Sequence, residues 1–239
     1  MIKRNTLFTT DVSAYAKGSV ISEFGNTKVL CTVMVEEKVP HFIKDTGSGW
    51  ITSEYSMLPA STQNRKVRDS SRGKVDGRSQ EIQRLIGRSL RSAIDLKKLG
   101  ERTLWVDCDV LQADGGTRTA AITGAWLALR MACDSLLEEG LIKEDPITHQ
   151  VAAISVGVVK GEVVADLCYD QDSAAQVDMN LVMDGNGDFI EIQGTGEESP
   201  FSMERLMEML ELGKKAIELL IQEQIIALIA HNEKKKLSK

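Results

Sequence analysis

The alternation of apolar and polar residues predicts several strands in the first half of the chain. The run Ser19–Glu23 and the β-branched run Thr27–Glu36 flank a Gly-Asn turn, which is typical of a β-hairpin. The same alternation recurs in GWITSEYSMLP at residues 49–59 and in TLWVDCDVLQ at residues 103–112. The first half is therefore rich in predicted strands.

Apolar residues at helical spacing predict three long helices, over about Ser79–Lys98, Arg118–Glu139 and Ser202–Ala230. Ser202 is a good N-cap residue for the last of them. The second helix begins with almost only small or apolar residues, so we expect it to be buried. On the first helix, Arg84, Arg88 and Arg91 share the face opposite the apolar one. They either solvate that face or bind RNA or a partner subunit, and the sequence supports both equally.

The second half of the chain repeats the order of strands followed by a helix. Two strand-like runs meet at Lys160–Gly161, and a second hairpin turns at Asp184–Asp188. This order predicts an α+β fold in which helices pack on largely mixed sheets. No linker divides the chain, so we expect a single domain over residues 1–239, with the polar and basic residues 232–239 as a frayed tail.

Composition places the chain among ordinary globular proteins, since 42% of its 239 residues are hydrophobic and 27% are charged. The formal net charge of -6 argues against a protein that coats nucleic acid by overall charge. The polar segment 61–78, however, carries five arginines and lysines before Arg78 and predicts a mobile basic loop. We expect a cytoplasmic protein without a membrane span, because no apolar run approaches about 18 residues and no signal peptide is recognisable.

Cysteine and histidine patterns give no support to zinc binding or covalent catalysis. The four cysteines form no C-x-x-C pair, so we expect buried, reduced thiols. The three histidines lie in no triad or metal-ligand spacing, and no serine or cysteine has a recognisable companion base. The four cysteines are Cys31, Cys108, Cys133 and Cys168, and the three histidines are His41, His149 and His231.

A candidate anion site lies in QADGGTRTAAITGA at residues 112–125. The start of a helix presents unpaired N–H groups and partial positive charge, and its two glycines allow a ligand to approach the backbone closely. Arg118 adds a planar fork suited to phosphate, and Asp114 is placed to order the turn. Arg78 precedes another helix start after a glycine. The two starts together predict one phosphate site if they converge, whereas a Gly-Gly turn by itself is often only a turn.

Carboxylates cluster in YDQDSAAQVDMN, where Asp172 and Asp178 stand six positions apart beside Asp170. Carboxylates, water and phosphate oxygens are the ligands that Mg²⁺ prefers. In isolation, a polar loop with surface acids is the better explanation of the cluster. Beside a phosphate site a magnesium-binding pair becomes the better interpretation, because phosphoryl chemistry usually needs a cation.

Five sequence blocks resemble, in order, the signature blocks of the ribonuclease PH family. They are GSVISEFGNTKVLCT, GWITSEYSMLP, GRSQEIQRLIGRSLRSAIDL, LGERTLWVDCDVLQADGGTRTAAITGA and DSAAQVDMNLVM, and EIQGTGEESPF follows before the last helix. Together they extend over nearly the whole chain. A chance match of this extent is not credible.

The resemblance implies a phosphate-dependent 3′→5′ exoribonuclease that trims tRNA precursors and releases nucleoside diphosphates, a reaction that also runs in reverse as nucleotidyl transfer. It implies a fold like the second domain of ribosomal protein S5 and a hexameric ring of three dimers. The family's phosphate-binding residues match Arg78, Gly116, Thr117 and Arg118, its RNA-binding arginines match Arg65 and Arg68, and its metal-associated acids match Asp172 and Asp178. Inorganic phosphate is then the co-substrate, and Mg²⁺ the expected metal. Asp178 is a candidate either for a metal ligand or for a general acid.

Two departures from the family's pattern concern the predicted RNA-binding surface. The chain opens almost directly at IKRNTL, without an arginine-rich start, and Ala60 stands where the family has an arginine after MLP. Both departures remove positive charge, so we expect catalysis at the phosphate site to be intact and the affinity for tRNA to be lower. The alternative of a non-catalytic ring subunit predicts the loss of an arginine or an acid, but Arg78, Arg118, Asp172 and Asp178 are all present. A small-molecule kinase would need a glycine-rich ATP loop with serines, which is absent.

Overall fold

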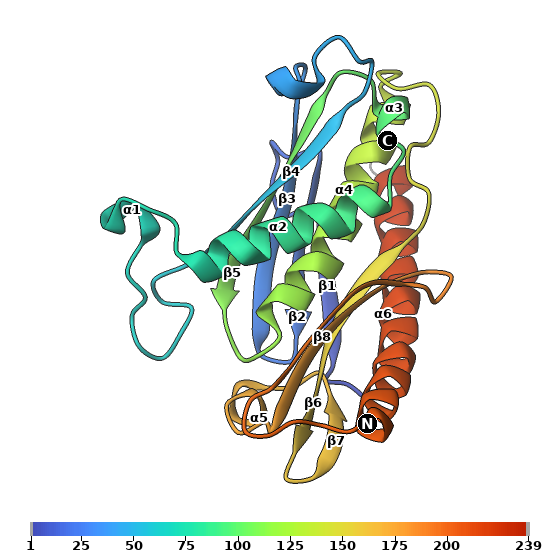
Figure 1. Ribbon diagram of the computed structural model, residues 1–239. Coiled ribbons are helices and arrows are strands. Elements are labelled where there is room, and N and C mark those ends of the chain that lie inside the picture. The colour runs from blue at the N-terminus through green and yellow to red at the C-terminus, as the bar shows by residue number, and fades with distance from the viewer. Residues whose placement is uncertain (1, 238–239) are drawn as a thin grey trace.

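In the computed structural model, which describes residues 2–237, the first half of the chain forms a five-stranded sheet (Figure 1). The strand order is β1-β2-β3-β5-β4, and all neighbours are antiparallel except the parallel pair β4 and β5. The predicted hairpin and the two later strands are confirmed. The strands are β1 (Thr6–Thr10), β2 (Gly18–Phe24), β3 (Thr27–Glu36), β4 (Trp50–Met57) and β5 (Thr103–Gln112).

The second half forms a four-stranded antiparallel sheet with the order β7-β6-β8-β9. Its strands confirm the predicted runs and the predicted hairpin. They are β6 (Val151–Val159), β7 (Glu162–Ala165), β8 (Val177–Asp184) and β9 (Phe189–Gly196). Helix α4 (Thr117–Glu138) packs against β2 and β3 of the first sheet and β6 of the second, so that both sheets share one hydrophobic core. The α+β fold class with mixed sheets is confirmed.

Helix α4 is the predicted buried helix. It has the length and apolar composition of a membrane span, but 78% of its most apolar window is buried inside the protein, as is typical of a core helix. Gly124 is needed in its middle, because a Cβ there would lie 2.6 Å from the Cβ of Ser22 on β2. The glycine therefore allows the helix to lie close on the first sheet.

The predicted helix over Ser79–Lys98 is divided in two. Helix α2 (Gly77–Ser92) ends before Ala93, and Asp95 then caps the separate short helix α3 (Leu96–Leu99) by accepting a hydrogen bond from the Lys97 N–H. Because the Asp95 carboxylate competes with helical backbone bonding, the helix breaks there.

The three arginines of α2 also differ from one another. Arg91 lies 4.8 Å over the Trp50 ring and donates to the Ile51 carbonyl, and Arg88 forms an ion pair with Glu191.

The last helix, α6 (Met203–Leu237), continues well beyond the predicted end near Ala230. The expectation of a frayed tail over 232–239 is therefore wrong for 232–237, and residues 238–239 lie outside the described part. Contacts with the body of the protein hold these turns: Lys235 pairs with Glu138 of α4 at 2.8 Å, and His231 Nδ1 lies 2.9 Å from an Asp11 carboxylate oxygen. Tertiary contacts stabilise a segment whose composition alone favours disorder.

Three shorter elements and one edge strand were not predicted. Helix α1 (Asp69–Arg72) lies within the basic loop, α5 (Tyr169–Asp172) lies within the acidic cluster, and a 3₁₀ turn covers His41–Ile43. Strand β1 pairs along the edge of the first sheet with β2. Of the cysteines, Cys31, Cys108 and Cys133 are buried and free as expected, whereas Cys168 is partly exposed.

Candidate active site

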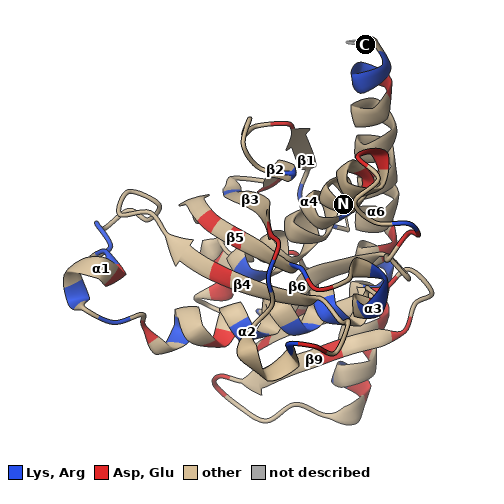
Figure 2. Cartoon of the chain, turned by 90° about the horizontal axis from the view of Figure 1, so that it is seen from above, with Lys and Arg blue, Asp and Glu red and all other residues tan. Residues whose placement is uncertain are grey.

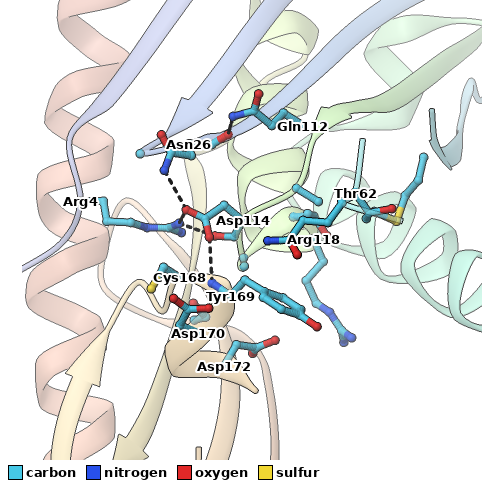
Figure 3. A pocket seen from close by; sticks show the side chains of 18 of the residues that line it. Arg4, Asn26, Thr62, Gln112, Asp114, Arg118, Cys168, Tyr169, Asp170 and Asp172 are labelled. Atoms are coloured by element: carbon cyan, nitrogen blue, oxygen red, sulfur yellow. Dashed lines mark hydrogen bonds and ion pairs between the residues drawn. The ribbon is translucent and has the colours of Figure 1, made fainter. Parts of the chain in front are cut away.

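A pocket of about 1040 Å³ opens where the turn between β5 and α4 meets the segment between β7 and β8 (Figure 3). Its walls come from the N-terminal segment, the hairpin turn after β2, the loop after β4, and helices α2, α4 and α5. The sequence-predicted phosphate and metal residues all line this one pocket, namely Arg78, Gly116, Thr117, Arg118, Asp172 and Asp178. The two helix starts that the sequence left unconnected therefore do converge.

The glycine pair at the turn before α4 is required by the protein's own packing. Gly115 and Gly116 have φ angles of 72° and 63°, in the left-handed region that favours glycine. A Cβ on Gly115 would lie 2.3 Å from the carbonyl oxygen of Leu167. The glycine thus lets the turn touch the segment that leads into α5. This contact brings the acidic segment to the start of α4.

Asp114 fastens the same two segments together. Its carboxylate accepts hydrogen bonds from the backbone N–H of Tyr169 at 3.0 Å and from Asn26 at 3.1 Å (Figure 3). Arg4 donates to the Asp114 carbonyl at 2.6 Å and forms an ion pair with the buried Asp166 at 2.6 Å. The expectation that Asp114 orders the turn is confirmed. Sequence reasoning missed Arg4, which is more than 100 positions from its partners and lies in no motif.

Replacing Gly115 by alanine should therefore disturb both stability and the site. We expect a loss of about 2–4 kcal/mol in the free energy of unfolding, since a strained φ and a steric clash act together, and a large loss of activity because the acids shift. Gly161→Ala is the matched control, because Gly161 has a φ of 82° but no atom within 4 Å of the place where a Cβ would lie. Urea denaturation should show about 1–2 kcal/mol for the control. Equal losses for the two variants would contradict the packing role of Gly115.

The start of α4 is open to an anion, whereas the start of α2 is not. No side chain caps α4, whose N-cap residue is Gly116. The α2 start is capped by Asp76, which accepts from the Ser79 N–H at 2.6 Å. Burial opposes ionisation of Asp76, but hydrogen bonds from Ser79 and the charge of Lys66 lower its pKa to about 2. Helix α2 therefore contributes the Arg78 side chain to the pocket, and the free backbone donors come from α4.

Arg118 extends from the first turn of α4, and its side chain is 13% exposed. One terminal nitrogen donates to Gln193 at 2.6 Å and to Glu81 at 3.3 Å, and Gln193 also donates to Glu81 at 2.8 Å. These partners, from β9 and α2, hold the guanidinium at the pocket wall. Within residues 2–237 its other nitrogens make no hydrogen bond, so the guanidinium has N–H donors available for an anion.

Thr117 is buried, and its hydroxyl lies 2.8 Å from the hydroxyl of Tyr55 on β4. Burial raises the pKa of Tyr55, so this phenol stays protonated at neutral pH. The charges of Arg78 and Arg118 oppose that rise, which places both cations within electrostatic reach of the same hydroxyl. The Thr117 side chain therefore ties the helix start to the first sheet, and its backbone N–H is the group available to a ligand.

Asp178 on β8 is the most perturbed acid of the pocket. Burial raises its pKa to about 6, and the neighbouring Asp172 charge adds to the rise, while Arg118 and Arg78 oppose it. One of its carboxylate oxygens is buried and has no hydrogen-bond partner within the described residues. A buried carboxylate oxygen without a donor is costly unless a cation, a ligand or a proton satisfies it.

The residues present fit a magnesium ion. Asp172 and Asp178 both line the pocket and are the two carboxylates that would hold a cation here; no group of three or more metal-ligating side chains is found among residues 2–237. Mg²⁺ commonly binds in this way, with water and phosphate oxygens completing its coordination. The unpartnered oxygen of Asp178 supplies a ligand atom of the right type.

Arg65 and Arg68 lie outside this pocket. Both are exposed on the loop that contains α1, which projects from the body of the protein and carries several Lys and Arg positions (Figure 2). Thr62, Gln63 and Asn64 of the same loop do line the pocket. The two arginines therefore follow directly on a segment of the pocket wall.

Comparison with known proteins identifies the family. The first domain of the 3′ exoribonuclease family matches residues 3–133, and its second domain matches residues 149–216. The chain belongs to the 3′ exoribonuclease family. Proteins named ribonuclease PH are 56% identical in Bacillus velezensis and 55% identical in Bacillus subtilis, each over 92% of this chain and 91% of that protein. The resemblance in the sequence blocks is thereby confirmed, and the chain is an enzyme of the phosphorolytic exoribonuclease type.

Solved structures share the fold at lower identity. Rice Rrp46 matches with a TM-score of 0.76 and 22% identity over 95% of both chains. A chain of the Archaeoglobus fulgidus exosome with RNA bound to the active site matches with a TM-score of 0.77 and 20% identity, over 92% of this chain and 88% of that chain. At these identities the likeness supports the fold alone. It confirms the two-sheet architecture that places the pocket.

Proposed function

We propose that the protein shortens RNA from its 3′ end with inorganic phosphate as the attacking reagent, and that the pocket at the start of α4 is where this occurs. The observation that carries the assignment is the convergence of an uncapped helix start, two arginines and two acids in one pocket of a 3′ exoribonuclease family member. Phosphate is a substrate of the ribonuclease PH family, and the helix start and the arginines suit an anion.

The reaction follows from where these groups lie. Phosphate held by Arg78, Arg118 and the first N–H groups of α4 attacks the phosphorus of the last phosphodiester. The bond from that phosphorus to the 3′ oxygen of the preceding nucleotide breaks, and this oxygen takes up a proton. The products are a nucleoside diphosphate and an RNA one nucleotide shorter. Because phosphate is already nucleophilic, the protein needs mainly to align it and to neutralise charge.

Asp178 and Asp172 face the leaving oxygen in this arrangement. With a pKa of about 6, Asp178 is protonated often enough near neutral pH to serve as a general acid. The same two carboxylates are the candidate ligands of Mg²⁺, which when bound supplies positive charge at the scissile phosphate and the leaving oxygen. In the second role Asp178 would be ionised, and its buried oxygen without a hydrogen-bond partner would be a ligand of the cation.

The proposed substrates are tRNA precursors, and the proposed assembly is a cytoplasmic hexameric ring of three dimers. Exposed apolar residues on α6 support an assembled state, since Ile225, Ile226 and Ile229 are 42%, 65% and 53% exposed on neighbouring turns. The basic loop with Arg65 and Arg68 supports binding of an RNA backbone beside the pocket. Ala60 adds no positive charge beside this loop, and it therefore weakens RNA binding without changing the phosphate site.

A precursor tRNA with a 3′ trailer tests this proposal. In the presence of phosphate and Mg²⁺ the trailer should shorten stepwise, with the oligomer sized in parallel by light scattering. A non-catalytic ring subunit would bind the RNA without shortening it. That outcome would assign the pocket to RNA binding only.

Arg65→Ala should weaken tRNA binding and reduce its salt dependence. Each lost phosphate contact lowers the slope of log affinity against log salt by about 0.7 to 0.9. The KM for inorganic phosphate should stay unchanged, because Arg65 does not line the pocket. Lys143→Ala removes an exposed charge outside the pocket and serves as the control. An unchanged salt slope in Arg65→Ala would exclude this arginine from the RNA path.

A further inference from the structure

One aromatic side chain in the pocket is not used by the chemistry described above. Among the described residues that line the pocket, Tyr169 is the single aromatic one, and it is 56% exposed. In Figure 3 its ring projects from α5 into the space bounded by Arg118 and Asp172. An exposed ring at this place, surrounded by charged and polar groups, lacks the packing partners that would explain it as core.

The backbone of Tyr169 is fixed in place. Its N–H donates to Asp114 at 3.0 Å, and its carbonyl accepts from the Ser173 N–H at 2.9 Å. Tyr169 and Asp172 are the first and last residues of α5, and residues three apart in a helix share a face. The ring is therefore carried by the same short helix that presents a candidate acid to the scissile bond. A change in the side chain leaves both backbone hydrogen bonds possible.

We infer that the ring of Tyr169 stacks on the base of the 3′-terminal nucleotide, the one that leaves as a diphosphate. This inference rests on the proposed function. If the RNA arrives along the basic loop, whose residues 62–64 line the pocket, the nucleotide beyond the scissile bond lies near α5, because α5 carries Asp172, the candidate acid at that bond. Stacking is tolerant of sequence because every base has a flat face, so it suits an enzyme that removes nucleotides one after another.

Stacking on an aromatic ring contributes about a ten- to hundredfold gain in binding per base. Tyr169→Leu should therefore raise the KM for RNA by about this factor and leave the KM for phosphate unchanged, since the phosphate groups are elsewhere in the pocket. Tyr169→Phe keeps the ring and should behave as the unaltered protein does. Tyr15→Leu is the matched control, because Tyr15 is 89% exposed and lies outside the pocket.

The decisive experiment removes the base instead of the ring. Single-turnover release of the first nucleotide is measured from a single-stranded oligoribonucleotide whose 3′-terminal or penultimate nucleotide is abasic. We expect the terminal abasic site to slow the unaltered protein about ten- to a hundredfold and to add little further loss in Tyr169→Leu. The inference would be overturned if the losses from the terminal abasic site and from Tyr169→Leu multiplied, because the ring and the terminal base would then act independently. It would also be overturned if the effect of Tyr169→Leu depended on the penultimate base instead, or if Tyr169→Phe lost as much activity as Tyr169→Leu. If the unaltered protein releases nothing from the normal oligonucleotide with phosphate, the proposed function fails instead.

Discussion

Replacing Asp178 by asparagine is expected to slow phosphorolysis by about a hundredfold or more and, at the same time, to stabilise the folded protein. The loss of rate follows from either proposed role, since asparagine can neither donate the proton to the leaving oxygen nor bind a cation as a charged ligand. Asp170→Asn is the matched control, because Asp170 is an exposed acid on the same short helix α5. An equal loss in both variants would show that only the overall charge of the pocket matters.

The gain in stability follows from the pKa of Asp178. Its value of about 6 in the folded protein exceeds its ordinary value of 3.8, chiefly because of burial. The raised pKa therefore stabilises the folded state, fully so below pH 3.8, and this stabilisation is lost as the pH rises through 6. At pH 8 asparagine removes a cost of up to about 3 kcal/mol. Urea denaturation in EDTA, at one protein concentration, should show a difference between the two proteins that grows from pH 4 to pH 8. A difference that is constant with pH would contradict the assigned pKa.

Replacing Arg118 by alanine should abolish phosphate use while RNA binding largely persists. The guanidinium is held at the pocket wall by Gln193 and Glu81 and keeps free donors for a small anion. Loss of such a preorganised donor typically costs about a hundred- to a thousandfold in rate. Lysine at this position restores the charge but not the planar fork, so Arg118→Lys should recover only part of the activity.

Two measurements separate the role of Arg118 from a general loss of charge. The KM for phosphate should rise steeply in Arg118→Ala, and the dissociation constant for a single-stranded RNA measured without phosphate should change less than about threefold. A collapse of RNA binding equal to the loss of activity would contradict the assignment of this arginine to the small anion.

The sequence predicted the long elements well because they carry their own periodicity. Strands β2, β3 and β5 alternate, and the first half of helix α4 is almost entirely small or apolar, as suits a helix that both sheets cover. The end of α6 was mispredicted because its last turns are held by Glu138 and Asp11, contacts that composition does not reveal. The break after Ser92 depends on one capping carboxylate, Asp95.

For the pocket, the sequence predicted which residues matter and not how they meet. The anion groups around Arg118 could be recognised locally, because glycines, arginine and a helix start are adjacent in the chain. Their approach to Asp172 depends on the contact between Gly115 and Leu167 and on the hydrogen bonds of Asp114 and Arg4. These contacts join segments more than 50 positions apart, and no local pattern encodes them.

The identity of the released nucleotide tests the proposed function most directly. A single-stranded RNA is incubated with the protein and Mg²⁺, with and without inorganic phosphate, and the products are separated by anion-exchange chromatography. We expect shortening only with phosphate, and nucleoside diphosphates as the sole nucleotide product. Release of nucleoside monophosphates without phosphate would mean that water is the nucleophile, and would contradict the proposal that this pocket holds phosphate for attack.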